Sequence, residues 1–434
     1  MPVAFSFRKV LAGAGLALAA AACTSNSSSS EKAASGESAA TNANYLKAGT
    51  WRGVLSTQGQ EIPFLFEVES GNNNQPVAVY LRNGAEKLKL DEIKAAGDST
   101  TIRLGAFDAA LVVRADGSDK LKGTWVKYDT KDPYRVPFTA TQGEQKLFPV
   151  SNAKPQSFDG TWAVTFKEDD GKTYPAVGIF KQNGTDVTGT FLTTTGDYRY
   201  LAGQVDGSTL KLSTFDGSHG FLFTGAMLAD DTLDSIKGDF YSGKSGHETW
   251  FAMINPNAKL PDANALTGMK PGQKKLDFKF PNIYEGGVIS PSDPKYKGKV
   301  VVVQILGSWC PNCMDETNFL APWYEKNKSR GVEIIGLGYE RSSDQKKASE
   351  RLVKMRERMH VGYDIAVAGV SNKDSASKSL PQLAQVLAFP TTIFLDKKGE
   401  VRKIHTGFSG PGTGKYYDAE IAEFNKTIDE LLKE

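Results

Sequence analysis

The C-terminal third of the chain alternates short apolar runs with longer amphipathic stretches. An apolar run at 300–306 predicts a strand, and a helical pattern follows it at 312–329. A second apolar run at 332–337 and a charged helical pattern at 344–359 repeat the order of strand and helix. This alternation is typical of an α/β layer with parallel strands.

The end of the same region predicts a hairpin flanked by helices. Residues 391–395 and 401–406 have the pattern of two strands joined by a Lys-Lys-Gly turn. A short helix is expected at 379–387, opened by Ser379, and a final helix at 417–432. The predicted layer therefore ends in an antiparallel pair of strands covered by a helix.

The middle of the chain has a different pattern, in which apolar and polar residues alternate between Gly, Asn-Gly and Asp-Gly turns. This pattern predicts antiparallel β-structure. The motif Gly-Thr-Trp at 49–51 returns at 160–162, which indicates a weak internal repeat. We therefore expect two β-units, 45–150 and 151–258, each a small barrel or sandwich. The pattern leaves open whether they close as two barrels or pack as one larger sheet system.

These patterns predict a multidomain chain. A β-rich N-terminal region, a duplicated small barrel or sandwich, is joined by a linker at 259–274 to a C-terminal α/β domain at 275–434. No apolar stretch, including the N-terminal run described next, is long enough to span a bilayer as a helix.

The N-terminus has the pattern of an export signal. At 1–22, basic residues precede an apolar run that is too short to span a bilayer. The run ends at Cys23 and resembles a bacterial lipobox, although Ala20 stands where that motif usually has leucine. Lipidation of Cys23 would explain an odd cysteine in an exported protein; the alternative is an ordinary secretory signal cut nearby. The small polar residues that complete 23–44 predict a flexible tether.

The candidate chemistry lies where the strand predicted at 300–306 gives way to a helix. The sequence there is Trp309-Cys310-Pro311-Asn312-Cys313. Two cysteines at this spacing can close a small disulfide and reopen it. The first would sit at a helix N-terminus, where free N–H groups and the helix dipole stabilise a thiolate. We therefore expect Cys310 to be the nucleophile and Cys313 the resolving thiol, with Pro311 at the first helical position.

Two structural interpretations of the cysteine pair are weaker. Half of a zinc site would need further ligands, but the third cysteine is Cys23 and no His pair has ligand spacing. An inert bridge across so small a loop would stabilise little. We expect no metal, and no cofactor beyond the redox-active Cys310–Cys313 disulfide.

These residues resemble the thioredoxin fold, and more closely the TlpA/ResA-like group of membrane-tethered thiol–disulfide oxidoreductases. The resemblance rests on the cysteine motif after a strand, on Phe389-Pro390 opening a later strand, and on the lead-in at 276–281. It covers about 275–434. It implies that Pro390 is a cis-proline facing the dithiol and that the Phe389 backbone can pair with an extended substrate segment. Considered alone, Pro390 is also compatible with a proline that simply starts a strand.

Two further positions gain meaning from the resemblance. Thioredoxin has a buried acid six residues before its first cysteine, where this chain has Gln304. The TlpA/ResA-like group often has a glutamate three residues after the second cysteine, and Glu316 occupies that position here. A carboxylate one helical turn from a thiol can accept its proton. The alternative is a solvated surface charge, because Asp315 and Glu316 adjoin in a polar stretch.

The resemblance implies a periplasm-facing lipoprotein, in either the inner or the outer membrane, that reduces disulfides of exported proteins. It also implies a membrane thiol–disulfide protein as electron donor and, in some members, cytochrome c cysteines as targets. Two alternatives stay open. One is a lipoprotein that binds glycan or protein through aromatics near Tyr198, Tyr200 and Trp250. The other is a peroxiredoxin-like thiol peroxidase, although the residues before Cys310 lack the threonine of that family.

The charge balance gives no sign of nucleic-acid binding. The chain has 52 basic and 50 acidic residues, for a formal net charge of +2. The basic residues at 346–358 are interleaved with Glu350 and Glu357, which is typical of a solvated helix face.

Overall fold

The computed structural model describes residues 45–72, 76–130, 134–151, 153–228, 234–284 and 286–434. These residues belong to one compact unit. The export signal, Cys23 and the tether lie outside the described residues. Among the residues that are described, no helix is both long and apolar enough to cross a membrane.

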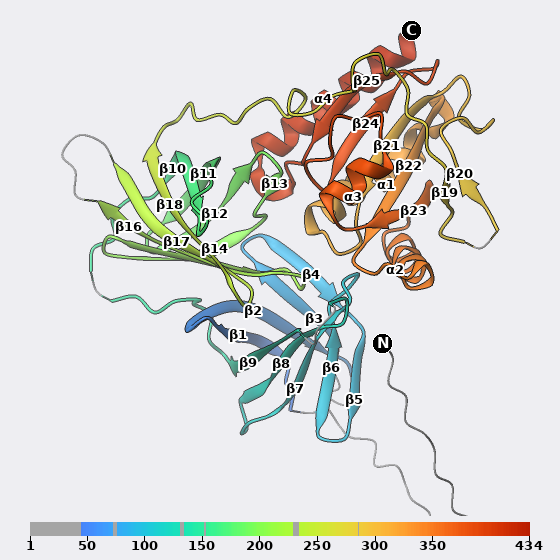
Figure 1. Ribbon diagram of the computed structural model, residues 1–434. Coiled ribbons are helices and arrows are strands. Elements are labelled where there is room, and N and C mark those ends of the chain that lie inside the picture. The colour runs from blue at the N-terminus through green and yellow to red at the C-terminus, as the bar shows by residue number, and fades with distance from the viewer. Residues whose placement is uncertain (1–44, 73–75, 131–133, 152, 229–233, 285) are drawn as a thin grey trace, which may run out of the picture. The chain divides into compact units, whose positions relative to one another are not determined.

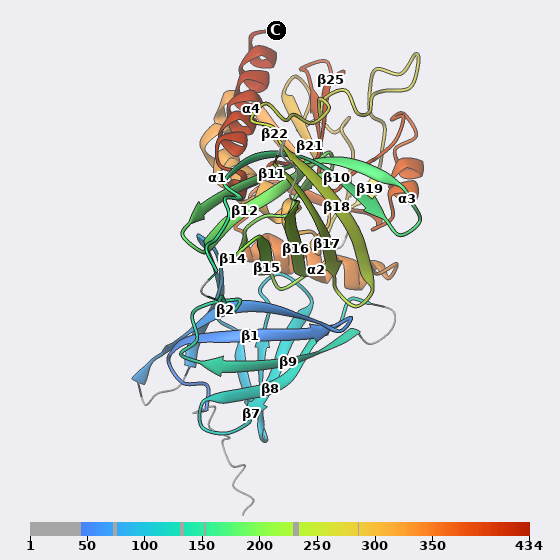
Figure 2. The same ribbon diagram turned by 90° about the vertical axis from the view of Figure 1, so that its left-hand side faces the viewer.

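The first nine strands form one antiparallel sheet, coloured blue to teal in Figure 1. They are β1 (Gly49–Thr57), β2 (Gln60–Ser70), β3 (Pro76–Asn83), β4 (Glu86–Leu90), β5 (Ile93–Ala96), β6 (Ser99–Arg103), β7 (Ala109–Ala115), β8 (Lys120–Lys127) and β9 (Tyr134–Gln142). Their order is β4-β3-β2-β1-β9-β8-β7-β6-β5, and Figure 2 shows β1, β9, β8 and β7 side by side. Inward-facing aromatic residues such as Trp51, Phe64 and Phe138 fill the core of this sheet.

The next nine strands form a second antiparallel sheet that closes on itself. They are β10 (Gly160–Glu168), β11 (Thr173–Asn183), β12 (Asp186–Thr193), β13 (Gly196–Asp197), β14 (Leu201–Asp206), β15 (Thr209–Phe215), β16 (Gly220–Leu228), β17 (Ser235–Ser242) and β18 (Gly246–Ile254). The order is β11-β10-β18-β17-β16-β15-β14-β12-β13, and β11 also pairs with β12. The β-rich prediction is thus realised as two separate sheets, and the extra pairing makes the second a barrel.

The two sheets share apolar contacts. Phe215 and Leu222 of the second sheet belong to the core of the first. The Asn83 amide donates to the Phe215 carbonyl at 3.0 Å and accepts from its N–H at 3.2 Å. Since burial of apolar surface is the dominant favourable term in folding, these contacts join the sheets into one body. We refer to both sheets together, residues 45–258, as the β-region.

The C-terminal part is a five-stranded mixed sheet with helices on both faces. Its strands are β21 (Val300–Leu306), β22 (Val332–Glu340), β23 (Asp364–Val370), β24 (Thr391–Leu395) and β25 (Val401–Thr406). Its helices are α1 (Pro311–Asn327), α2 (Gln345–Arg358), α3 (Lys373–Ser379) and α4 (Lys415–Lys433), with short 3-10 turns η2 (Lys328–Arg330) and η3 (Pro411–Thr413). A small hairpin, β19 (Phe280–Pro281) and β20 (Val288–Ile289), precedes them.

The strand order of this sheet is β23-β22-β21-β24-β25, and β21, β22 and β23 run parallel. The strand β24 runs antiparallel to β21 and forms the predicted hairpin with β25. Side chains from α1, α2 and α4 pack against one face of the sheet, and those from α3 against the other. The single α/β layer predicted for 275–434 is therefore present, and β21 lies at its centre.

One prediction for this domain is wrong, and one strand was not predicted. The helix expected at 379–387 is absent: α3 ends at Ser379, and it begins after Asn372, whose side chain accepts from the Ser375 N–H at 2.9 Å. Pro381 explains the end, because the residue before a proline is disfavoured in helical conformation. The sequence also gave no prediction of β23, an edge strand whose apolar run is interrupted by Gly369.

Candidate dithiol active site

The two cysteines lie at the junction between the central strand and the first helix. Cys310 is the N-cap of α1, with extended backbone angles (φ −103°, ψ 111°), and Pro311 begins the helix. A proline fits there because the first helical N–H has no partner within the helix. The Cys310 Sγ accepts a hydrogen bond from the Cys313 N–H at 3.2 Å. The cysteines are joined by a disulfide, with 5.3 Å between their Cα atoms.

Solvent access distinguishes the two sulfur-bearing residues. Cys310 is 5% exposed, whereas Cys313 is fully buried. A reacting partner can therefore touch Cys310 but not Cys313. The local geometry also favours charge on Cys310, because its sulfur faces a backbone N–H at the positive end of a helix.

A second segment of the domain faces the disulfide. The Phe389–Pro390 peptide bond is cis, and the Phe389 carbonyl oxygen lies 3.3 Å from the Cys310 Sγ. The Trp309 ring meets the Phe389 ring edge-on, with 5.5 Å between centroids. The Trp309 indole N–H donates to the Tyr339 carbonyl at 2.8 Å. The structure thus brings Trp309, Cys310, Phe389 and Pro390 together from separate segments.

Glu316 is a buried carboxyl group and not a surface charge. Both Asp315 and Glu316 are buried, at 6% and 4% exposure, so the solvated-surface alternative is wrong. The Glu316 carboxyl accepts hydrogen bonds from the Gln304 amide at 2.7 Å and from the Thr392 hydroxyl. The Gln304 carbonyl oxygen in turn accepts from the Tyr363 hydroxyl at 3.0 Å. Gln304, at the position of thioredoxin's buried acid, therefore holds a carboxyl group in place.

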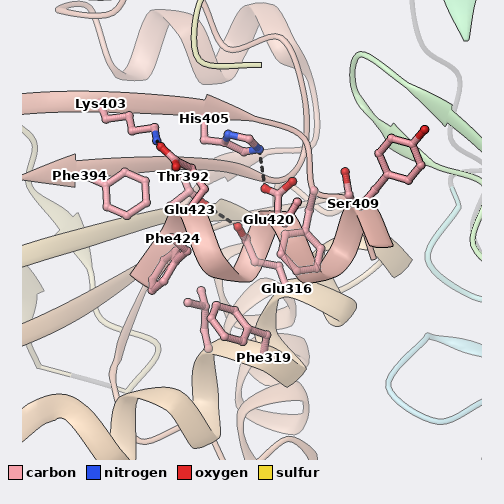
Figure 3. A pocket seen from close by; sticks show the side chains of 14 residues that line it. Glu316, Phe319, Thr392, Phe394, Lys403, His405, Ser409, Glu420, Glu423 and Phe424 are labelled. Carbon is pink, nitrogen blue, oxygen red and sulfur yellow. Dashed lines mark hydrogen bonds and ion pairs between the residues drawn. The ribbon is translucent and has the colours of Figure 1, made fainter. Parts of the chain in front are cut away.

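A cavity of about 270 Å³ lies beside this carboxyl group. Figure 3 shows Glu316 at its wall together with the His405–Glu420 ion pair, in which Nε2 and Oε1 are 2.5 Å apart. Phe319 and Phe394 supply part of the apolar wall. Burial raises the pKa of Glu316 to about 7, although its hydrogen bonds act in the opposite direction. Near neutral pH this group can both hold and release a proton.

Replacing Glu316 by glutamine should change how stability depends on pH. A folded pKa of about 7, above the ordinary value of 4.5, means that the folded chain binds more protons than the unfolded chain between these values. Stability of the unaltered chain should therefore fall as pH rises through this window. Glu316→Gln removes that loss. The free energy of unfolding of the variant should therefore exceed that of the unaltered chain by about 3 kcal/mol at about pH 8 and by much less at about pH 5.

Urea unfolding at the two pH values measures this effect. Glu423→Gln is a matched control, because Glu423 lines the same cavity but is exposed and paired with Lys403 at 2.7 Å. That pairing lowers the pKa of Glu423. Glu423→Gln should therefore lower the free energy of unfolding, whereas Glu316→Gln should raise it. An equal stability change for Glu316→Gln at both pH values would contradict the buried carboxyl group described here.

Sequence reasoning missed the residues of the β-region that contact the cysteine motif. The Asn312 side-chain amide donates to the Asp197 carbonyl oxygen at 3.1 Å. The Arg199 guanidinium pairs with Asp315 at 2.9 Å and with Glu86 at 2.5 Å. These partners are more than a hundred residues away in sequence, as the separation of 116 between Arg199 and Asp315 illustrates. The adjacent acids at 315 and 316 were the sequence feature that could have indicated such partners, since two carboxyl groups require partners when they are buried.

The C-terminal part matches known proteins. Residues 270–421 match the Redoxin family model. The chain is 30% identical over 112 residues to the thiol-disulfide oxidoreductase ResA of Geobacillus kaustophilus, which covers 26% of this chain and 57% of that protein. It is 23% identical over 155 residues to the thiol:disulfide interchange protein DsbE of Escherichia coli K12, covering 36% of this chain and 75% of that one.

A solved structure is similar over a comparable share of the chain. The crystal structure of a thiol:disulfide interchange protein of the thioredoxin family from Chlorobium tepidum has 16% sequence identity and a TM-score of 0.29, covering 38% of this chain and 99% of that one. The chain spans only about half the length of the ResA proteins that it matches.

The family match and the ResA and DsbE relatives confirm the resemblance found in residues 275–434. Lipidation at Cys23 and the roles of the individual site residues stay predictions. Residues 270–421 are therefore similar to a Redoxin domain, and the chain is similar to the thiol–disulfide oxidoreductases named ResA and DsbE.

Proposed function

We propose that this chain reduces disulfides of exported proteins through the Cys310–Cys313 dithiol. The observation that carries the proposal is the disulfide at the N-terminus of α1, which faces the cis Phe389–Pro390 peptide. A pair of cysteines at this junction can alternate between dithiol and disulfide with little rearrangement of the domain. The matched relatives are named for the same reaction type, thiol–disulfide exchange.

The exchange proceeds in two steps that together move two electrons. The Cys310 thiolate attacks one sulfur of the substrate disulfide, which forms a mixed disulfide and releases the other substrate sulfur as a thiolate. The Cys313 sulfur, after losing its proton, attacks Cys310 and releases the second substrate thiolate. The substrate gains two electrons and two protons, and the Cys310–Cys313 disulfide is left. A reduced thiol protein must then return two electrons.

The residues around the dithiol support this order of attack. The limited exposure of Cys310 and the burial of Cys313 allow a substrate to meet only Cys310 first. The Cys313 N–H stabilises negative charge on the Cys310 sulfur. Glu316, one turn further along α1, is proposed as the acceptor of the Cys313 proton. Phe389 is proposed to pair through its backbone with an extended segment of the substrate.

The compartment and the partners are part of the proposal. We infer a periplasm-facing lipoprotein, tethered to the membrane through a lipid on Cys23 and supplied with electrons by a membrane thiol–disulfide protein. Cytochrome c precursors are the proposed exported targets, since some TlpA/ResA-like proteins free the cysteines that receive haem. The tether would let the folded part of the chain stand off the membrane surface.

The glycan-binding alternative loses part of its support. Trp250 is 2% exposed and lies in the core of the second sheet. Tyr198 packs its ring against those of Phe223 and Phe240, with centroids 5.1 and 5.0 Å apart. A sugar-stacking platform requires aromatic faces that are open to solvent, and these two residues do not offer one.

Insulin reduction with dithiothreitol as electron donor tests the function. The full chain should accelerate the appearance of insulin precipitate well beyond dithiothreitol alone. A rate equal to that of dithiothreitol alone would overturn the proposal. Consumption of hydrogen peroxide by the reduced chain, in the absence of disulfide exchange, would instead favour the peroxidase alternative.

A further inference from the structure

The β-region of the same chain contacts the residues that flank Cys310 in the cysteine motif. Two loops of the second sheet, residues 194–200 and 216–219, reach the cysteine motif, and we call them the cover loops. The Ser218 hydroxyl donates to the carbonyl oxygen of Trp309 at 3.1 Å. The Asn312 amide, between the two cysteines, bonds to the Asp197 carbonyl. The cover loops thus contact the motif on both sides of Cys310.

The cover loops also reach residues 407–410, the segment that follows β25 and lies next to the cis-proline. The Gly407 N–H donates to the Pro390 carbonyl at 3.0 Å, which places Gly407 beside the cis-proline. A Cβ atom at Gly407 would lie 3.0 Å from the carbonyl carbon of Thr195. The Asp197 carboxyl accepts from the Gly410 N–H at 2.7 Å. The cover loops therefore contact both the cysteine motif and the segment beside Pro390.

Arg199 joins the cover to the active-site helix. Its guanidinium lies between Asp315 of α1 and Glu86 of the first sheet, at 2.9 and 2.5 Å. All three side chains are less than one-tenth exposed. Two atoms of this group, Arg199 Nε and Asp315 Oδ2, are buried without a hydrogen-bond partner in the part of the chain that the structure describes. Water would satisfy both atoms if the contact opened, which lowers the free energy required for separation.

The rest of the contact between the β-region and the α/β domain is rich in charge. Arg341 pairs with Asp129 at 2.8 Å, and Arg351 with Asp108 at 2.9 Å. Arg358 pairs with Asp91 at 2.9 Å and also with Glu92, while Phe107 adds an apolar contact to this face. The prediction that the basic residues of α2 form a solvated face is therefore wrong for these residues.

This composition distinguishes two kinds of contact. The two β-sheets share an apolar core, whereas the β-region meets the α/β domain through ion pairs and hydrogen bonds together with smaller apolar contacts, such as that of Tyr416 with the cluster around Val177. Contacts of the second kind are typical of interfaces that open and close. The chain crosses between the two parts once, through residues 255–279, so separation need not unfold either part.

We propose that the β-region is a reversible cover over the dithiol, latched by Arg199, which decides which disulfides reach Cys310. This proposal rests on the proposed function. With the cover closed, the slight exposure of Cys310 admits a small disulfide but excludes a folded protein. A protein disulfide gains access only after the cover loops leave the cysteine motif. The β-region thereby sets substrate size and access, while the chemistry stays with the dithiol.

Alkylation of Cys310 measures the cover without requiring disulfide exchange. In a full chain carrying Cys23→Ser and Cys313→Ser, Cys310 is the remaining thiol. Its labelling rates by iodoacetamide and by a maleimide with a long polyethylene glycol chain are compared. Arg199→Gln should raise the rate with the bulky reagent by about tenfold relative to iodoacetamide, since it leaves the Asp315 and Glu86 carboxylates buried without their counter-charge in the closed state.

A second variant tests the same proposal in case Arg199→Gln does not fold. Arg358→Glu lies at the partly exposed edge of the contact, where it would repel Asp91 and Glu92, and it should raise the same ratio. Arg330→Gln is the matched control, because it removes an exposed pair with Asp429 elsewhere in the α/β domain and should leave the ratio unchanged. Circular dichroism checks that each variant is folded.

The two proposals can fail separately. The cover is overturned if folded Arg199→Gln and Arg358→Glu both have the same ratio of maleimide to iodoacetamide labelling rates as the unaltered chain. This conclusion holds whether or not the chain reduces insulin. If the ratio rises as expected but neither the unaltered chain nor Arg199→Gln reduces insulin, the cover stands and the proposed function is overturned. A small disulfide such as glutathione disulfide should be reduced at similar rates by the chain with and without Arg199→Gln.

Discussion

Replacing Cys310 by serine should reduce the rate of insulin reduction to that of dithiothreitol alone. A serine hydroxyl is not ionised near neutral pH and cannot form the mixed disulfide on which the exchange depends. The buried Cys313 cannot substitute for it, because no substrate sulfur can reach a fully buried side chain. The expected effect is therefore complete loss of turnover and not a partial decrease.

Cys313→Ser provides the matched comparison. This variant keeps the attacking thiol but lacks the resolving one, so it should lose turnover and accumulate a mixed disulfide between Cys310 and its substrate. Non-reducing gel electrophoresis would reveal that species, and Cys310→Ser should not form it. Insulin reduction that survived in Cys310→Ser would show that the nucleophile is assigned to the wrong residue.

Replacing Trp250 by alanine should destabilise the β-region by about 3–5 kcal/mol, the usual effect of emptying a large buried aromatic site. Trp250 is 2% exposed and fills space that two glycines leave open. A Cβ atom at Gly225 or Gly238 would lie 2.9 or 2.5 Å from its ring. Urea unfolding of the full chain measures the loss.

The neighbouring residue is the control for this substitution. Phe251 follows Trp250 on the same strand but points to the opposite face and is 42% exposed. Phe251→Ala should therefore change the unfolding free energy by well under half as much. Equal losses for the two variants would contradict the barrel interior described for the second sheet.

The elements nearest the dithiol could be predicted because local signals determine them. All residues of β21 are buried, and its sequence is an apolar run interrupted only by Gln304. Pro311 starts a helix and thereby makes Cys310 its N-cap. The turn at 397–399 defines the hairpin of β24 and β25. These features depend on neighbours in sequence, which is the information that a single sequence contains.

The features that the sequence did not reveal depend on distant partners. The closure of the second sheet requires β11 to pair with β12 as well as β10, and alternation alone does not distinguish this from an open sheet. Asp315 looked like a surface acid until Arg199 appeared beside it. The helix expected from Ser379 failed because Asn372 caps the earlier turn. Contacts of this kind are visible only once the chain is folded.

The reduction potential of the Cys310–Cys313 pair tests the central claim most directly. The full chain, with Cys23→Ser to remove the third thiol, would be equilibrated in thiol buffers and its free thiols counted. A reductant should have a potential near that of thioredoxin, about −270 mV. A value near −120 mV would identify an oxidant that introduces disulfides. That value, or failure of the pair to form a bridge, would contradict the proposal that this chain reduces disulfides.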